Sequence, residues 1–300
     1  MQKTFDINDH PCFNRSISGK YGRVHLPVAP ACNIQCNYCN RLFDCPNEGR
    51  PGVTGRLLRP TEALAHLTRV MAGHTPISVV GIAGPGDPLA NPNNTFQTLD
   101  LVRRKYPNVL LCLSTNGLMA TSFLREIVRT VSHITLTVNA VDASVGTRIY
   151  DWIRLGGRVY TGIEAASILL ERQLETIQLL TRAGLVVKVN TVVIPGVNDH
   201  HIIDVARKME ELSVNIFNAM PVYPVEGTPF ADVREPSGCE MRALRNRARA
   251  YLPQMTHCAR CRSDAAGLIG RDAVPHELPV QANTCIADRG RPVKKCSANP

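Results

Sequence analysis

The chain has 300 residues, of which 44% are hydrophobic and 20% are charged, and its formal net charge is +9. These proportions are typical of globular proteins and exclude a disordered or fibrous chain. The length suits one large α/β domain of roughly 200 to 250 residues with additional segments. The positive charge permits anionic partners but identifies none.

The eleven cysteines indicate metal ligands rather than disulfides. Their density is far below that of a disulfide-rich secreted domain, and an odd number cannot pair completely. The first ten residues contain two aspartates and no apolar core, so we expect no secretory signal. The longest uncharged stretch, 106–124, is interrupted by proline, asparagine and glycine, which argues against a membrane span. We therefore expect a cytoplasmic monomer with no membrane or nucleic-acid partner.

Short β-branched runs alternate with helical patterns along most of the chain. The expected strands are 24–29, 77–83, 109–114, 133–139, 185–193 and 214–219. The expected helices between them are 61–72, 95–105, 120–130, 164–182 and 200–212. This alternation predicts a parallel α/β sheet with crossovers, and six units predict a partial (β/α)6 barrel whose reactive face lies at the carboxyl ends of the strands. A doubly wound open sheet is the alternative.

Three parts are expected along the chain. Residues 1–23 form an N-terminal extension, residues 24–234 the partial barrel, and residues 235–300 a C-terminal extension. In the last part the alternation stops, and an arginine-rich helix is followed by a CxxC motif and a proline-punctuated tail. A tail with so little periodicity buries too little apolar surface to order itself, so we expect bound metal to hold it.

The strongest motif is the CxxxCxxC formed by Cys32, Cys36 and Cys39, directly after the first expected strand. Three such thiolates can hold three irons of a four-iron four-sulfur cluster and leave the fourth iron open. Zinc is the weaker alternative, because structural zinc sites are closed by four ligands. The spacing, the tyrosine before the last cysteine and the position after the first strand resemble the radical S-adenosylmethionine (SAM) superfamily. The resemblance implies that SAM binds the open iron and is cleaved to a 5′-deoxyadenosyl radical.

Later strand ends offer residues for a SAM pocket. Gly84-Pro-Gly86 follows the second expected strand, at the position of the superfamily's glycine motif, where a missing Cβ allows close backbone approach. Alternation along the third strand puts Cys112, Ser114 and Asn116 on one face. Buried polar side chains need partners, which SAM or a core hydrogen-bond network could supply equally well. The candidate SAM-binding residues are Gly84, Gly86, Ser114, Asn116, Thr137, Asn139 and Asn190, the last sharing a strand face with Lys188.

Eight cysteines lie outside the CxxxCxxC motif. Cys12 and Cys45 could approach His25 around the motif, and for these three the residues alone favour ligand and ordinary roles equally. The CxxC at 258–261 could bind zinc, act in redox chemistry or supply half of a cluster. Cys112, in a strand that reads VLLCLS, is by pattern alone typical of a buried unreactive thiol.

A longer set of residues resembles the NifB family of nitrogenase iron–molybdenum cofactor biosynthesis proteins. The resemblance rests on HPC at 10–12, VAPACNIQCNYCNR at 28–41, GIAGPGDPLAN at 81–91, IPGVND at 194–199 and the residues around the CxxC at 258–261. It covers nearly all of residues 10–270. It implies a radical SAM partial barrel with N- and C-terminal cluster-binding extensions, in a form without the cofactor-carrier domain of some members.

The family resemblance implies a reaction in which two four-iron four-sulfur clusters are fused around a SAM-derived carbide into the eight-iron precursor of the nitrogenase cofactor. One SAM would donate a methyl group and another would supply the radical, in an enzyme of lyase or transferase type. The implied partners are an iron–sulfur cluster donor, an electron donor and a carrier or scaffold protein of nitrogenase assembly.

The resemblance also assigns residues by position. Cys32, Cys36 and Cys39 would hold the SAM cluster. Cys12, His25 and Cys45 would hold one substrate cluster, and Cys112, Cys258 and Cys261 the second. Cys112 would also act in catalysis, because its cluster must face the carbon that SAM delivers. Glu48 and Arg50 are candidates for proton transfer or for anchoring their loop.

Some residues depart from the family pattern, and two other functions remain open. Leu42-Phe43 and Gly49 differ from the residues expected there, which affects details of the loop around Glu48. One alternative is a radical SAM peptide maturase, in which Cys258, Cys261, Cys285 and Cys296 hold a single auxiliary cluster. The other is a non-catalytic iron–sulfur scaffold, which needs no SAM pocket. The family resemblance gives no role to Cys239, Cys285 and Cys296.

Overall fold

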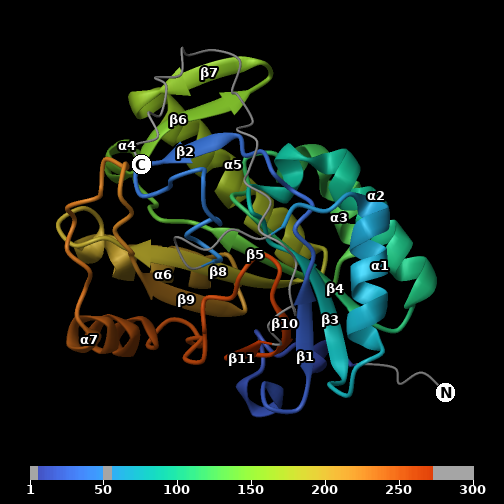
Figure 1. Ribbon diagram of the computed structural model, residues 1–300. Helices are drawn as coiled ribbons and strands as arrows, with labels where there is room; N and C mark the ends of the chain where they lie inside the picture. Colours follow the sequence, from blue (N-terminus) through green and yellow to red (C-terminus); the bar gives the residue numbers. More distant parts are fainter. Residues whose placement is uncertain (1–5, 50–55, 273–300) are drawn as a thin grey trace, which may run out of the picture.

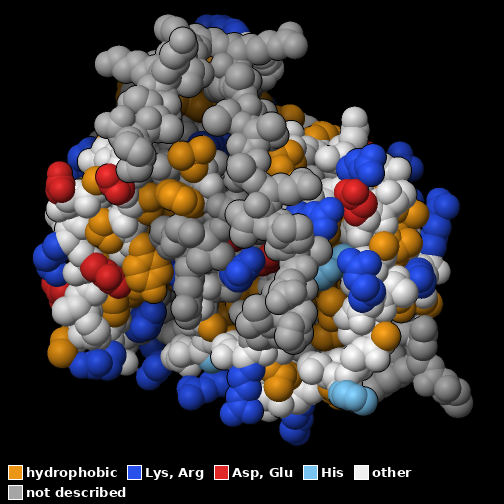
Figure 2. All heavy atoms as spheres, viewed as in Figure 1, with side chains coloured by type: hydrophobic (Ala, Val, Ile, Leu, Met, Phe, Trp, Pro, Cys, Tyr) orange, Lys and Arg blue, Asp and Glu red, His pale blue; other side chains and the backbone are white. Residues whose placement is uncertain are grey.

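The computed structural model describes residues 6–49 and 56–272 (Figure 1). The predictions for Arg50, Cys285 and Cys296 lie outside these residues. No helix in the described part of the chain has both the length and the apolar character needed to cross a membrane. Lys and Arg side chains are spread over the visible face rather than gathered in one patch (Figure 2).

A curled eight-stranded sheet forms the body of the molecule, in the order β11-β10-β1-β3-β4-β5-β8-β9 (Figure 1). Six neighbouring strands are parallel: β1 (Gly22–His25), β3 (Ile77–Ile82), β4 (Leu110–Thr115), β5 (His133–Thr137), β8 (Val186–Val193) and β9 (Ile216–Pro221). The crossovers are α1 (Pro60–Met71), α2 (Pro92–Lys105), α3 (Leu124–Thr130), α5 (Gly162–Arg182) and α6 (Ile202–Glu211). This half-barrel confirms the predicted six-unit fold rather than a doubly wound sheet.

Most predicted elements begin or end a few residues from their expected bounds, and two of them shift the most. The strand expected at 24–29 ends at His25, because Pro27 has no N–H for the ladder, and only an isolated bridge joins Ala29 to Pro85 beyond it. The helix expected at 120–130 begins as a 3-10 turn, Ala120–Phe123, and becomes α-helical only at Leu124.

A second sheet of three antiparallel strands was not predicted from the sequence. It contains β2 (Ile34–Cys36), β6 (Tyr150–Leu155) and β7 (Arg158–Thr161). Helix α4 (Ala143–Ile149) leads directly into β6. Gly156 and Gly157, both with positive φ, make the tight turn of the β6–β7 hairpin. A Gly-Gly pair between two alternating runs was the sequence signal for this hairpin. The small sheet carries part of the CxxxCxxC motif on β2.

The apolar core lies between the large sheet and its helices. Leu67 of α1, Leu99 of α2 and Phe217 of β9 are fully buried there, and each such side chain stabilises the fold by about 1.5–3 kcal/mol. Strand residues alternate between this core and the inside of the curl. In β8, Val187 and Val189 belong to the core, so the intervening Lys188 points the other way.

The C-terminal extension joins the sheet instead of remaining an appendage. Helix α7 (Gly238–Ala248) has a Ser237–Glu240 capping box and buries Met241 in the core. Strand β10 (Ala266–Leu268) then pairs antiparallel with β1, and β11 (Arg271–Asp272) follows. Backbone pairing therefore orders this segment up to residue 272, a contribution that the sequence analysis missed.

Candidate functional site

Two adjoining cavities lie inside and above the curl of the sheet. We call the larger one the chamber; it encloses about 640 Å³, partly open to solvent, and is lined by residues of β3, β4, β5, β8 and β9. The smaller one, the motif cavity, encloses about 470 Å³ and is lined by Cys32, Cys36 and Cys39. The residues that line both cavities are Asn47, Glu48, Ala83 and Ser114. The two cavities therefore meet at Glu48 and Ser114.

Hydrogen bonds to the backbone hold the CxxxCxxC loop in shape. Gln35 Nε2 donates to the carbonyl oxygens of Cys36 (3.0 Å) and Cys39 (2.7 Å). Tyr38 is fully buried, and its hydroxyl donates to Asn47 Oδ1 at 2.8 Å and accepts from Asn139 Nδ2 at 2.6 Å. The loop is thus fixed on both sides of its last two cysteines.

The fold alone favours the protonated form of the motif thiols, whereas bound iron requires the thiolate form. Burial raises the pKa of Cys36, and it raises the pKa of Cys39 to about 12 although Arg41 opposes the shift. Metal ligation requires thiolates and so reverses this preference. Among the described residues no three His, Cys, Asp or Glu side chains lie close enough to hold a single metal ion. A four-iron cluster takes each thiolate on a separate iron, so the wider spacing is compatible with it.

The glycine turn after β3 packs directly on the start of the cysteine loop. A Cβ at Gly86 would lie 2.1 Å from the Ala31 carbonyl oxygen, so only glycine allows this approach. Asp87 N donates to the same oxygen at 2.8 Å. The buried Asp87 carboxylate accepts from Asn116 N at 2.6 Å and from Thr115 Oγ1 at 2.9 Å, although burial raises its pKa. The turn therefore links the cysteine loop to the end of β4.

The seven predicted SAM-binding residues do not all reach the motif cavity. Those that line it are Gly86, Ser114, Asn116 and Thr137. Gly84 does not line it, and Asn190 lines the chamber instead, where its Nδ2 donates to Glu48 Oε1 at 2.8 Å. Asn139 lines neither cavity, because its amide is used by Tyr38 and by Val192 N in the core.

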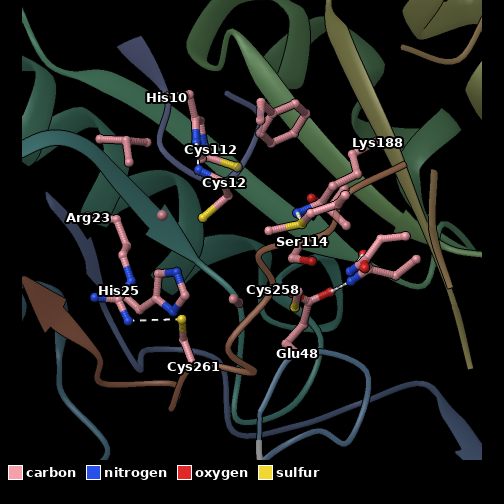
Figure 3. A pocket seen from close by; sticks show the side chains of 18 of the residues that line it. His10, Cys12, Arg23, His25, Glu48, Cys112, Ser114, Lys188, Cys258 and Cys261 are labelled. Carbon is pink, nitrogen blue, oxygen red and sulfur yellow. Dashed lines mark hydrogen bonds between the residues drawn. The ribbon is translucent and has the colours of Figure 1, made fainter. Parts of the chain in front are cut away.

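The chamber gathers ligand candidates from distant segments of the chain. Its lining includes Cys12, His25, Cys112, Cys258 and Cys261, whose side chains point into a common space (Figure 3). The predicted ligand Cys45 lines the motif cavity instead. The loop that follows Cys45 reaches the chamber through Glu48, and Ser263 Oγ, which donates to Asp44 Oδ1 at 2.8 Å, ties this loop to the C-terminal segment.

The N-terminal segment that carries Cys12 is anchored by tilted and edge-on contacts among the rings of His10, Phe13 and His133, which we call the ring stack. His10 lies with its ring centroid 4.6 Å from that of His133, and Phe13 lies 4.8 Å from His133. His257 Nε2 lies 2.8 Å from the Pro11 carbonyl oxygen. Burial lowers the pKa of His133 to about 4, so the imidazole in this stack is neutral near pH 7.

His25 has the form of a neutral nitrogen ligand. Burial lowers its pKa to about 4. Its Nδ1 lies 3.1 Å from the Arg262 carbonyl oxygen, which can only accept, so Nδ1 carries the proton. The unprotonated Nε2 is then free to bind a metal, as in many histidine sites whose other nitrogen donates to a carbonyl.

Two buried cations in the chamber were not predicted as functional. Arg23 is fully buried, and its guanidinium donates to the Cys261 sulfur at 2.9 Å and to the Gly267 carbonyl oxygen at 2.8 Å. Lys188 is 6% exposed. The sequence signal was available, since a lysine in the middle of the strand VVKVNTVV cannot face an apolar core without cost. Glu48 is the one acidic residue among the described residues that line the chamber, and burial raises its pKa.

Comparisons with known proteins show what the chain is similar to. The family model of the Radical SAM superfamily matches residues 26–209. The FeMo cofactor biosynthesis protein NifB of Chlorobaculum tepidum is 52% identical over 268 residues, which cover 89% of this chain and 63% of that protein. The protein of the same name from Klebsiella pneumoniae is 44% identical over 303 residues, covering 94% and 65%. These matches confirm the resemblance to NifB proteins, although the chain spans less than two thirds of either relative.

Solved structures with little sequence similarity share the fold. Methylornithine synthase (PylB) has a TM-score of 0.51 at 18% identity and covers 83% of this chain and 74% of its own. SuiB of Streptococcus suis bound to S-adenosylmethionine has a TM-score of 0.56 at 13% identity, covering 80% and 52%. At such low identity the likeness concerns the half-barrel alone.

Proposed function

Because this chain belongs to the radical SAM superfamily, we propose that it is an enzyme of nitrogenase cofactor assembly that fuses two four-iron four-sulfur clusters. A carbide derived from SAM would be inserted to form the eight-iron precursor of the cofactor. The proposal draws on the similarity to NifB proteins, which extends over 89% of the chain in the relative from Chlorobaculum tepidum.

The observation that carries the proposal is the single chamber beside the motif cavity. Five of the six predicted substrate-cluster ligands line one chamber, and they come from both predicted ligand sets. Two clusters held in one space can meet without leaving the protein. The shared wall at Glu48 and Ser114 puts that space next to the motif cavity.

Cys32, Cys36 and Cys39 would hold the resident four-iron cluster, with SAM beside it. When bound, this pair supplies one-electron cleavage of SAM. The residues around the motif cavity fit this pair. Three cysteine thiols line the cavity, and the turn at Gly86 allows close backbone approach. Asn116 and Thr137 add amide and hydroxyl groups. Tyr38 and Gln35 keep the loop in one conformation, so binding does not require the loop to be ordered first.

The chamber residues would bind the two substrate clusters. Cys112, Cys258 and Cys261 form one ligand set. Cys12 and His25 belong to the other, and Cys45 completes it only if that cluster lies at the junction of the two cavities. An imidazole is a neutral ligand without the charge of a thiolate, so His25 suits a cluster that must leave its site to fuse.

Glu48 is placed to hold a proton where the two cavities meet. Burial raises the pKa of its carboxyl, and Asn190 Nδ2 orients one of its oxygens. A carboxyl with a raised pKa holds a proton more readily than an exposed carboxyl does, as a proton donor must. The role proposed for Arg50, proton transfer or loop anchoring, stays a prediction from sequence.

The proposed reaction needs other proteins. An iron–sulfur cluster donor would supply the substrates, an electron donor would reduce the resident cluster, and a carrier or scaffold protein would accept the product.

Anaerobic reconstitution of the full chain with iron and sulfide tests this function. We expect about twelve irons per chain, from three four-iron clusters. Reduced protein should cleave SAM, and label from the SAM methyl group should appear in an extractable iron–sulfur product. Two clusters without label transfer would favour a peptide maturase, and clusters without SAM cleavage would favour a scaffold. Either result would contradict the proposal.

A further inference from the structure

The Lys188 ammonium lies buried in the chamber without a carboxylate partner. Its Nζ lies 3.9 Å from the Met255 sulfur and 4.9 Å from the centroid of the Phe13 ring. Across the described part of the chain, no carboxylate oxygen lies within 4.0 Å of this nitrogen. Fully buried lysines are rare unless they are paired, because an ammonium loses its hydration on burial.

The groups that do face this ammonium are the proposed cluster ligands. The side chains that interact electrostatically with Lys188 include Cys12, Glu48, Cys258 and Cys112. Figure 3 shows Lys188 reaching from its strand into the same space as these side chains. One of the thiols belongs to the first proposed ligand set and two belong to the second. The lysine therefore shares one chamber with members of both sets.

The chamber as a whole has an excess of positive charge. Lys188 and Arg23 contribute two buried cations, and Glu48 is the one acidic residue among its described lining residues. A buried charge excess of this kind favours an occupant of the opposite sign. Iron–sulfur clusters with thiolate ligands are anions, and their sulfides accept hydrogen bonds.

We propose that Lys188 is a positioning residue that holds the anionic substrate clusters in the chamber, by compensating their charge and donating N–H hydrogen bonds to their sulfur atoms. This inference rests on the proposed function and extends it. Two clusters of like charge repel each other as they approach, and the repulsion is strong where water is excluded. A cation in the chamber that both ligand sets line lowers that repulsion at the place where fusion must occur.

Lys188→Met tests the inference, because methionine keeps the length of the side chain and removes its charge. In the anaerobically reconstituted full chain, we expect Lys188→Met to lose at least about four of the twelve irons. SAM cleavage measured on the same sample reports separately on the motif cavity, which Lys188 does not line. Lys188→Arg, which retains the charge, should retain most of the iron. Lys208→Met is the matched control, because it removes an equal charge from the exposed face of α6.

A second measurement separates this role from a purely structural one. In the iron-free full chain Lys188 is an unpaired buried charge, so Lys188→Met should raise the unfolding temperature measured by calorimetry. A lysine that merely supports the fold would give a lower unfolding temperature on the same change.

The outcomes distinguish failure of this inference from failure of the proposed function. Wild-type protein with about twelve irons, together with a Lys188→Met variant of equal iron content, would overturn the role of Lys188 and leave the proposed function standing. A lowered unfolding temperature of iron-free Lys188→Met would also overturn it. Wild-type protein with about four irons would overturn both, because the chamber would then hold no clusters.

Discussion

The motif cavity and the chamber hold their candidate ligands by opposite means. The motif thiols come from one loop, residues 32–39, in which Gln35 bonds to the carbonyls of Cys36 and Cys39. The chamber ligands come from four places along the chain between Cys12 and Cys261, which only the folded sheet brings together. Three ligands within eight residues stay near one another when distant contacts are lost, whereas the ligands of an assembled chamber do not. The two cavities should therefore respond differently to the same kind of change.

The largest expected effect is the loss of one cavity's function while the other cavity is unaffected. Cys36→Ala should abolish SAM cleavage, because the resident cluster loses one of its three thiolates. The chamber should keep its iron, since Cys36 does not line it. SAM cleavage and iron content measured on one reconstituted sample test this, with the exposed Cys239→Ala as control. Wild-type SAM cleavage by Cys36→Ala would refute the assignment of the motif.

The converse change is Cys112→Ala in β4. If Cys112 is a ligand, the variant should lose about four irons and all labelled product while it still cleaves SAM. If it is only a buried thiol, the change should lower the free energy of unfolding by about 1 kcal/mol and leave the iron in place. Iron analysis and denaturant unfolding distinguish the two cases. Full iron content with normal product would show that a residue other than Cys112 is the third ligand of the cluster held by Cys258 and Cys261.

Much of the motif cavity could be predicted from sequence because its chemistry is local. The spacing of the cysteines alone indicated the cluster, and strand alternation put Ser114 and Asn116 at the cavity. Asn139 lies outside this cavity, because alternation fixes a strand face but does not show whether a core hydrogen-bond network occupies it. Its part in SAM binding stays a prediction.

The chamber could be predicted only in part. Period and composition predicted the six parallel strands, but no local rule brings residue 12 to residue 258. The expected ligands there came from family resemblance. The charge of the chamber was not predicted, because Arg23 and Lys188 lie far apart in the sequence and only the curled sheet brings β1 and β8 to one cavity. Cys45 illustrates the same limit, because its loop passes between the cavities and its side chain lines the one not expected.

A smaller effect is expected where the glycine turn meets the cysteine loop. Gly86→Ala would force a Cβ against the Ala31 carbonyl oxygen, so the turn must move. We expect the free energy of unfolding to fall by about 1–3 kcal/mol, and SAM affinity to fall about tenfold. Equilibrium binding and denaturant unfolding measure the two effects. Gly19→Ala is the control, because its Cβ would meet nothing within 4 Å; equal behaviour of the two variants would contradict the packing argument.

The smallest expected effect is a loss of stability at low pH in the N-terminal segment that lines the chamber, with no such loss in the motif loop. His133 has an ordinary pKa of 6.5, and burial lowers it to about 4 in the fold. The unfolded segment therefore binds the proton more readily, so the ring stack is fully stable above pH 6.5 and weakens as the pH falls from 6.5 toward 4. In iron-free chain, amide exchange of residues 6–13, corrected for intrinsic rates, should rise by up to about tenfold per pH unit in this window.

A matched variant sharpens this last comparison. His133→Phe keeps a ring in the stack and removes one of the two titrating groups, so it should reduce the pH dependence of exchange in residues 6–13. Amides of the loop at 32–39 should show no such dependence, because the ring stack does not contact it. An unchanged pH profile in His133→Phe would rule out His133 as the cause.

The antiparallel pairing of β10 with β1 has a consequence for how the protein is made. Strand β1 ends at residue 25, and its partner begins at residue 266. At about 5–20 residues per second, the ribosome needs on the order of ten seconds or more to synthesise the intervening chain. Throughout that time one edge of β1 has no partner and is open to pairing with other nascent chains. With four residues, β1 is short enough to limit that hazard. The chamber is complete only after Cys258 and Cys261 have been synthesised, so metal can enter it only late in synthesis or afterwards.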